Sequence, residues 1–172
     1  MEPVQVFVCY AREDEILRDA LEQHLGALKH SEHAVIWHDR KIQPGTNWAK
    51  EIDLHISTAD IILLLVSSHF IASDYCYSVE MRKALEKHEA RKTHVIPIIL
   101  RPVDWRETPL GKLQALPKDG RPIVTWHTRD SALVDIVRGI RRVIAQIQTD
   151  DWKRSSASEF GQIVVEGAEN HG

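Results

Sequence analysis

The chain has 172 residues, of which 43% are hydrophobic and 27% are charged, and its formal net charge is −3 at pH 7. A chain of this size and composition can bury a core as one folded domain, which argues against the disordered class, and it lacks the basic balance of a nucleic-acid-binding protein. It contains no apolar run of eighteen residues and no basic-then-apolar N-terminus, so we expect no contact with a membrane and no signal peptide.

The first three predicted elements are a strand, a helix and a strand. Residues 4–9 (VQVFVC) mix alternation with β-branched residues, a pattern typical of a strand. Residues 13–28 place apolar side chains on one helical face and begin with three acidic residues, which lie near the positive end of the helix dipole. Residues 33–37 (HAVIW) predict a second short strand.

The loop at residues 38–45 (HDRKIQPG) carries both signs of charge and ends in a Pro-Gly pair. That pair fits a type II turn, because proline fixes φ and glycine tolerates a positive φ. Thr46 or Asn47 can cap the helix that follows, which carries Trp48 near its start. Long loops of this kind often have a function, although a plain solvated connection is equally consistent with the sequence.

The central unit of the chain combines a strand, a loop and a helix. Residues 61–66 (IILLLV) predict a strand that is buried on both faces, as parallel sheets require. Ser73 or Asp74 can cap the next helix, whose second turn contains Glu80 beside an apolar stripe. Glu80 is therefore a candidate half-buried carboxylate at the edge where open parallel sheets bind ligands. The spacing also allows a simple surface ion pair with Lys83.

The last part of the predicted domain contains two strands and a helix. Residues 94–100 (HVIPIIL) predict a strand whose proline favours an edge position or a bulge. Residues 101–120 contain several prolines and glycines and should be irregular. Residues 122–125 (PIVT) predict a last short strand, and residues 130–147 have the period of a helix with one buried side.

Five strands alternating with helices predict an α/β fold, a flavodoxin-like five-stranded parallel sheet with helices on both faces. The strand order 2-1-3-4-5 is our first choice. We assign residues 1–147 to this domain. From residue 148 to residue 172 the chain turns polar and loses its period, so we expect a flexible linker or tail there.

Several common chemistries lack their signatures. Neither a G-x-G-x-x-G nor a G-x-x-x-x-G-K-[ST] motif is present, and the first and third predicted strands do not end in the acidic residues of a receiver domain. His30, His33 and His38 have no cysteine or carboxylate set beside them, so we predict no metal site and no bound cofactor. Cys9 and Cys76 fall in different predicted elements, which suits two thiols in a reducing cytoplasm.

Three segments, in this order, resemble a bacterial Toll/interleukin-1 receptor (TIR) domain over roughly residues 4–147. Residues 6–10 (VFVCY) are similar to the family's first box, a hydrophobic strand that ends in Ser-Tyr. Residues 37–45 (WHDRKIQPG) are similar to its BB loop, with the Asp-Arg and Pro-Gly pairs. Residues 67–76 (SSHFIASDYC) and Glu80 are similar to the loop and helix that carry the family's glutamate.

Two positions depart from the family pattern. Cys9 replaces the usual serine, a small change that a strand tolerates. Family members with a Trp-x-x-x-Glu motif have the aromatic residue four positions before the glutamate, whereas Cys76 holds that position here and Tyr75 and Tyr77 flank it.

The resemblance implies that NAD⁺ is a substrate, cleaved at its nicotinamide-ribose bond to release nicotinamide and ADP-ribose or a cyclic isomer. Glu80 would be the catalytic carboxylate. One carboxylate is sufficient, because nicotinamide departs as a neutral ring and needs no general acid. The family positions imply a substrate-binding set that consists of Tyr10, Arg12, Asp39, Trp48 and Cys76.

The resemblance also implies control by assembly with other TIR domains. The BB loop would pack on a neighbouring domain, and such a head-to-tail contact generates filaments when it does not close. The assembly residues would be Asp39, Arg40, Ile42, Pro44 and Gly45. We expect activation by self-assembly in bacterial antiphage defence, with a sensor domain or partner protein beyond the C-terminus.

Two other interpretations use the same surfaces. One is a non-catalytic adaptor that acts through homotypic TIR-TIR interaction, and the other is a bacterial mimic directed at the TIR signalling of a host. Glu80 favours the enzyme over the adaptor, whereas the altered aromatic spacing favours the adaptor.

Overall fold

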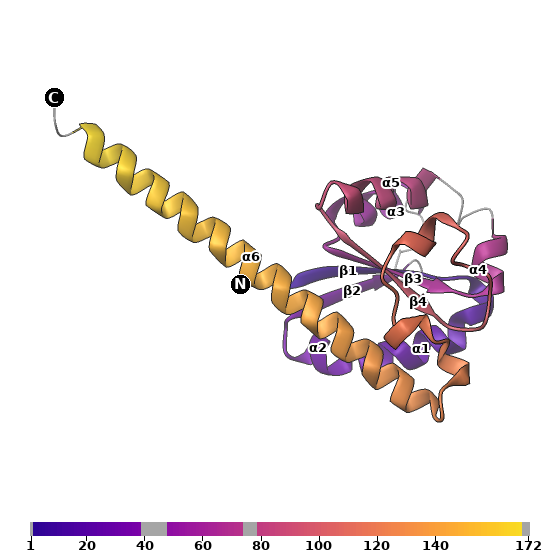
Figure 1. The fold of residues 1–172 in the computed structure, drawn as a ribbon. Coiled ribbons are helices and arrows are strands. Elements are labelled where there is room, and N and C mark those ends of the chain that lie inside the picture. The colour runs from indigo at the N-terminus through magenta and orange to yellow at the C-terminus, as the bar shows by residue number, and fades with distance from the viewer. Residues whose placement is uncertain (1, 39–47, 74–78, 170–172) are drawn as a thin grey trace.

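The structure is a computed structural model that describes residues 2–38, 48–73 and 79–169, with side chains described for 2–38, 50–73 and 81–150. Its centre is a parallel sheet of four described strands in the order β2-β1-β3-β4 (Figure 1). The strands are β1 (Val4–Cys9), β2 (Ala34–His38), β3 (Ile61–Val66) and β4 (His94–Ile99). All six residues of β3 are buried, which confirms the strand predicted to be covered on both faces.

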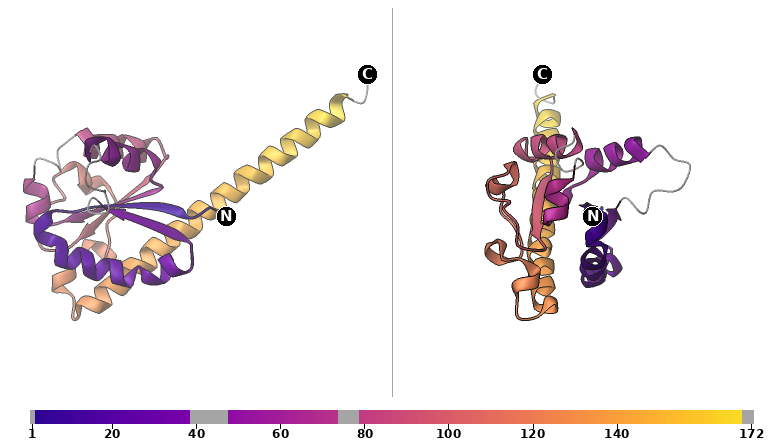
Figure 2. Two further views of the ribbon diagram at one scale, coloured as in Figure 1. Left: turned by 180° about the vertical axis from the view of Figure 1, so that it is seen from behind. Right: turned by 90° about the vertical axis from the view of Figure 1, so that its right-hand side faces the viewer.

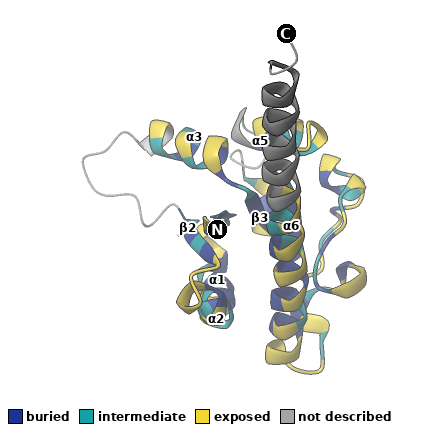
Figure 3. Cartoon of the chain, turned by 90° about the vertical axis from the view of Figure 1, so that its left-hand side faces the viewer, coloured by how far each residue is buried: buried dark blue, intermediate teal, exposed yellow. Residues whose placement is uncertain are grey.

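Helices cover both faces of the sheet, as predicted. The helices α1 (Glu15–His24), α2 (Gly26–His30) and α6 (Arg129–Glu169) pack on one face, around a core that includes Leu17, Leu21 and Ile136. The helices α3 (Trp48–Thr58) and α5 (Val79–Glu89) pack on the other, around a core that includes Ile52 and Met81. Figure 3 shows the buried residues along the sheet and on the helix sides that face it. Hydrophobic burial on both faces thus fixes a three-layer arrangement.

Shorter helices connect the main elements. The helix α4 (Ser68–Ala72) follows β3 directly. The 3₁₀ helices are η1 (Arg12–Asp14), η3 (Pro109–Lys112), η4 (Lys118–Gly120) and η5 (Ile123–Thr125). The helix predicted at 13–28 is therefore divided into η1, α1 and α2.

The prediction of a fifth strand at residues 122–125 is wrong. Pro122 precedes η5 and has no backbone N–H, and the N–H of Thr125 donates to its carbonyl at 3.0 Å, which closes a tight turn. The place beside β4 is taken instead by Leu116, whose N–H donates to the Pro97 carbonyl at 2.9 Å in a single isolated bridge. The sheet order is therefore 2-1-3-4, and Pro97 lies on the edge strand, as predicted.

The segment between β3 and α5 also differs from the prediction. Ser67 caps α4, and the hydroxyl of Ser73 donates to the Phe70 carbonyl at 2.7 Å at the end of that helix. The described part of α5 begins at Val79 and includes Glu80, and because residues 74–78 lie outside the described part, the placement of Glu80 in the second turn stays a prediction.

The helix α6 continues to Glu169, where the sequence led us to expect a flexible polar tail from residue 148. Its first half packs against the sheet layer beside α1, and the remainder extends past the sheet (Figure 2). The domain boundary at residue 147 stays a prediction.

Candidate functional site

The carboxyl ends of three neighbouring strands bring different polar groups to one edge of the sheet. Tyr10 follows β1, His38 ends β2 and Ser67 follows β3, and all three are buried. Val8 and His38 are register partners, and the rings of Tyr10 and His38 meet edge to face with centroids 6.2 Å apart. Open parallel sheets bind ligands at this edge, which makes it the candidate functional site.

A buried carboxylate joins the segments that follow β1 and β3. Asp14 of η1 has no exposed side-chain surface, and the hydroxyl of Ser67 donates a short hydrogen bond to its Oδ2. The same hydroxyl oxygen accepts from the N–H of Phe70 at 3.1 Å, which caps α4. Among the described residues, Oδ1 of Asp14 has no hydrogen-bond partner, and Nε of Arg101 lies 3.9 Å from it.

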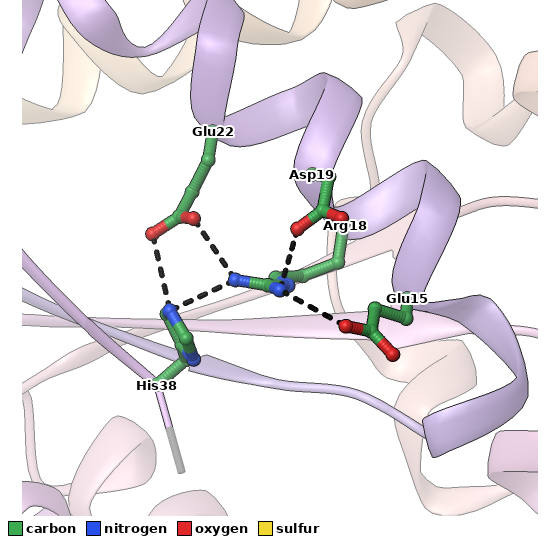
Figure 4. Close-up of polar contacts among 5 residues, drawn as sticks. All are labelled: Glu15, Arg18, Asp19, Glu22 and His38. Carbon is green, nitrogen blue, oxygen red and sulfur yellow. Dashed lines mark hydrogen bonds and ion pairs between the residues drawn. The ribbon is translucent and has the colours of Figure 1, made fainter. Parts of the chain in front are cut away.

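Arg18 of α1 is a second buried charge at this edge, with 6% of its side chain exposed (Figure 4). Its Nη1 lies 2.8 Å from Nε2 of His38, and its guanidinium carbon lies 5.0 Å from the centroid of the Tyr10 ring. Three acidic side chains of its own helix surround it: Asp19 at 2.5 Å, Glu22 at 2.9 Å and Glu15 at 3.9 Å. The guanidinium therefore connects α1 to the ends of β1 and β2.

The Arg18 contact determines which ring nitrogen of His38 carries the proton. A guanidinium can only donate, so Nε2 of His38 accepts and the proton lies on Nδ1. Oε1 of Glu22 lies 3.5 Å from the same Nε2 and would accept a hydrogen bond only if Nε2 carried a proton.

The predicted substrate-binding residues fall into three groups. Tyr10 is buried at the candidate edge, and Arg12 of η1 is exposed. Trp48 is the first residue of α3, and its side chain is outside the described part, as is that of Glu80. The remaining predicted site residues, Asp39, Arg40, Ile42, Pro44, Gly45 and Cys76, lie outside the described residues.

The helices α3, which begins at Trp48, and α5, which contains Glu80, contact each other. Nζ of Lys83 lies 3.4 Å from Oδ1 of Asp53, and Lys87 donates to the carbonyl of Ser57 at 2.7 Å. Both contacts join positions that are thirty apart in sequence, so the helices run parallel. These contacts place the middle and last turns of the two helices beside each other, and each helix has a predicted site residue in its first described turn, Trp48 in α3 and Glu80 in α5.

The sequence interpretation did not identify Asp14, Arg18, His38 or Ser67 as site residues. A signal for Arg18 was available, because it lies beside Leu17 and Leu21 on the apolar face of its helix. Ala34, Ile36 and His38 share the buried face of β2, but the apolar run before His38 does not reveal from the sequence which face points inward. Asp14 and Ser67 meet across the sheet edge, and no local pattern reveals such a contact.

A hollow of about 980 Å³ lies at the opposite edge, where β4 begins. Its lining includes His88, His94, Asp60 and Asp150. Burial lowers the pKa of His94, and the charge of His88 lowers it further, against the opposing charges of Asp150 and Asp60. The predicted site residues whose positions are described lie at the other edge, so we assign the functional site there despite the size of this hollow.

Two further findings concern only the described part of the chain. It contains no group of three or more histidine, cysteine, aspartate and glutamate side chains arranged to hold a metal ion. None of its helices is both long and apolar enough to cross a membrane. Cys9 is a buried thiol, and Cys76 is not described.

The comparisons with known proteins agree on one family. The family model described as TIR domain matches residues 6–136. The protein y4lF of Sinorhizobium fredii, named as uncharacterized, is 48% identical over 142 residues, which cover 83% of this chain and 44% of that protein. The chain thus spans less than half the length of this relative.

Among solved structures, the TIR domain of the Toll-related receptor TRR-2 from Hydra magnipapillata has the same fold. The TM-score is 0.56 at 21% sequence identity, and the match covers 80% of this chain and 96% of that one. The TIR domain heterodimer of RPS4 and RRS1 is less similar, with a TM-score of 0.49, 14% identity, and coverage of 83% of this chain and 98% of that one.

Proposed function

The chain belongs to the TIR domain family, and on that premise we propose that it cleaves NAD⁺ at the nicotinamide-ribose bond. The products would be nicotinamide and either ADP-ribose or a cyclic ADP-ribose isomer. Glu80 would be the catalytic carboxylate, and no metal or resident cofactor would be required.

The observation that best supports this proposal is the parallel packing of α3 and α5. Trp48 and Glu80 lie in the first described turns of these two helices, whose middle and last turns are joined by Lys83–Asp53 and Lys87–Ser57. Tyr10 and Ser67 are buried at the carboxyl edge of the sheet. A carboxylate and an aromatic ring at one edge form a suitable set for binding a ribosyl cation.

The chemistry requires little proton transfer. The bond between C1′ of the ribose and N1 of nicotinamide breaks, and its electron pair returns to the ring nitrogen, which leaves as neutral nicotinamide. Glu80 would stabilise the positive charge that develops on the ribosyl centre. Water then adds to C1′ and loses a proton to give ADP-ribose, or a nucleophile within the same molecule closes a cyclic product.

The other family positions supply substrate contacts in this proposal. Tyr10 and Arg12 would lie near the substrate, with the exposed guanidinium of Arg12 available to the diphosphate. Asp39 and Trp48 would border the site, and Cys76 would lie beside the ribose.

We also propose that assembly regulates the activity. The BB loop, with Asp39, Arg40, Ile42, Pro44 and Gly45, would bind the neighbouring TIR domain, and clustering would complete the site. The signal would come from a sensor domain or partner protein in a bacterial defence system, for which the greater length of the Sinorhizobium relative leaves room.

The test is nicotinamide release from NAD⁺ by the purified chain, alone and fused to a domain that forces oligomerisation, with products separated by chromatography. Glu80→Gln removes the proposed catalytic charge while keeping the size of the side chain. Glu86→Gln is the matched control, because it makes the same change at an exposed position of the same helix. We expect release by the wild type and by Glu86→Gln, and its loss in Glu80→Gln.

The same assay decides between the enzyme and a non-catalytic adaptor. The adaptor is favoured by Cys76, which occupies the position of the family's aromatic residue. Absence of nicotinamide release from the forced oligomer, together with retained binding between TIR domains, would support the adaptor and contradict catalysis.

A further inference from the structure

We infer that Arg18 is a positioning residue that sets the orientation of Tyr10 and the tautomer of His38 at the candidate edge. This inference rests on the proposed function for its effect on NAD⁺, because it concerns how that site is held. Arg18 is not one of the residues that the family resemblance assigned to the site.

The first reason is the burial of a charge that could have stayed in solvent. An arginine paired with acids one turn away on its own helix gains little when those pairs face water. Here the guanidinium is withdrawn from water, which costs several kcal/mol unless its partners compensate. The compensating acids lie on the same helix, with the side chain of Glu22 18% exposed and that of Asp19 52% exposed. The helix therefore carries its own counter-charges, and the guanidinium reaches across to the strands.

The second reason is the geometry of that reach. One planar group donates to the ring of His38 through Nη1 and stacks its carbon over the ring of Tyr10. These two residues follow or end adjacent strands, and their rings contact each other. Arg18 therefore contacts both rings at once. Figure 4 shows its contact with His38.

The third reason is chemical. Because Arg18 only donates, it imposes the form of His38 in which Nδ1 carries the proton. Removing Arg18 removes the donor that imposes this form, and Oε1 of Glu22, at 3.5 Å from Nε2, is a described acceptor for a proton on Nε2. The ring nitrogens of His38 thus report directly on the action of Arg18.

The experiment has one readout that needs no catalysis. Long-range ¹H–¹⁵N NMR correlations of the full chain identify the protonated ring nitrogen, with His38 assigned by comparison with His38→Gln. We expect protonation at Nδ1 in the wild type and in Glu22→Gln, which keeps Arg18. We expect the proton to move to Nε2 in Arg18→Met. If that variant does not fold, Arg18→Met/Asp19→Asn removes the charge of Asp19 together with that of Arg18, keeps Glu22, and is scored in the same way.

The second readout is a split between KM and kcat for NAD⁺. A misplaced Tyr10 ring weakens substrate binding, so Arg18→Met should raise KM by about tenfold or more while kcat changes by less than about threefold. The control is Lys87→Met, which removes the hydrogen bonds from Lys87 of α5 to the backbone at the end of α3, far from this edge. This variant should have a KM within about twofold of the wild-type value.

An unchanged tautomer of His38 in Arg18→Met would overturn the inference. A KM of Arg18→Met that stays within about twofold of the KM of Lys87→Met would also overturn the inference. If the wild type releases no nicotinamide, the proposed function fails, and the NMR result alone decides whether Arg18 positions His38.

Discussion

Replacing Ser67 by alanine should lower the free energy of unfolding by about 3 kcal/mol. The change removes the cap of α4, which costs about 1 kcal/mol. It also removes the hydrogen-bond donor to a carboxylate of Asp14 that has no exposed surface, which costs about 2 kcal/mol more. Both losses fall at the candidate edge, so this residue measures how firmly the segments after β1 and β3 are joined.

The assay is urea unfolding followed by far-ultraviolet circular dichroism, with Ser57→Ala as the matched control. Ser57 loses an equivalent hydroxyl, whose Oγ donates to the Asp53 carbonyl at 2.7 Å, but at an exposed helical position. That variant should change the free energy of unfolding by less than about 0.5 kcal/mol.

A double-mutant cycle separates the two contributions to the Ser67 effect. Combining Ser67→Ala with Asp14→Ala should reveal a coupling free energy of about 1.5–3 kcal/mol, the range for a hydrogen bond to a charged group. A coupling near zero, or a Ser67→Ala effect as small as that of Ser57→Ala, would refute the reasoning about this buried pair.

Three other results are expected. Burial lowers the pKa of His94, so as the pH falls below about 6.5 this histidine takes up a proton in the unfolded chain before it does so in the folded chain. The free energy of unfolding therefore decreases from that pH down to the lower pKa of the folded state. His94→Gln should reduce the drop in Tm between pH 7.5 and pH 5, and a drop equal to that of the wild type would contradict this. Gly111→Ala should cost about 2 kcal/mol or more in urea unfolding, because its Cβ would lie 1.9 Å from the carbonyl oxygen of Arg106, whereas Gly26→Ala meets nothing within 4 Å and should stabilise by about 0.5 kcal/mol. Forced oligomers should release nicotinamide faster per domain than dilute monomers, and equal rates would exclude activation by assembly.

The sequence predicted most of the fold because burial leaves simple patterns. The uninterrupted apolar run of β3 and the apolar faces of α1, α3 and α6 gave the order of elements and both covered faces of the sheet. The prediction of a fifth strand was wrong because residues 122–125 have the composition of a strand but form the turn of η5 after Pro122. Leu116 makes the bridge beside β4 instead. Composition over four residues cannot decide between these outcomes.

The candidate site was predicted only in part. Motif resemblance selected Tyr10 and the helices that carry Trp48 and Glu80, because those positions are tied to the ends of predicted elements. The contacts of Arg18 with His38 and of Asp14 with Ser67 depend on how α1 and the strand ends pack in three dimensions. Such contacts between separate elements leave no period in the sequence.

The ratio of nicotinamide release rates of Glu86→Gln and Glu80→Gln, measured as forced oligomers, tests the central claim most directly. The account predicts that Glu86→Gln keeps the wild-type rate and that Glu80→Gln is slower by about 100-fold or more, the loss expected when a group that stabilises transition-state charge is removed. Equal release by the two variants would contradict a catalytic role for Glu80.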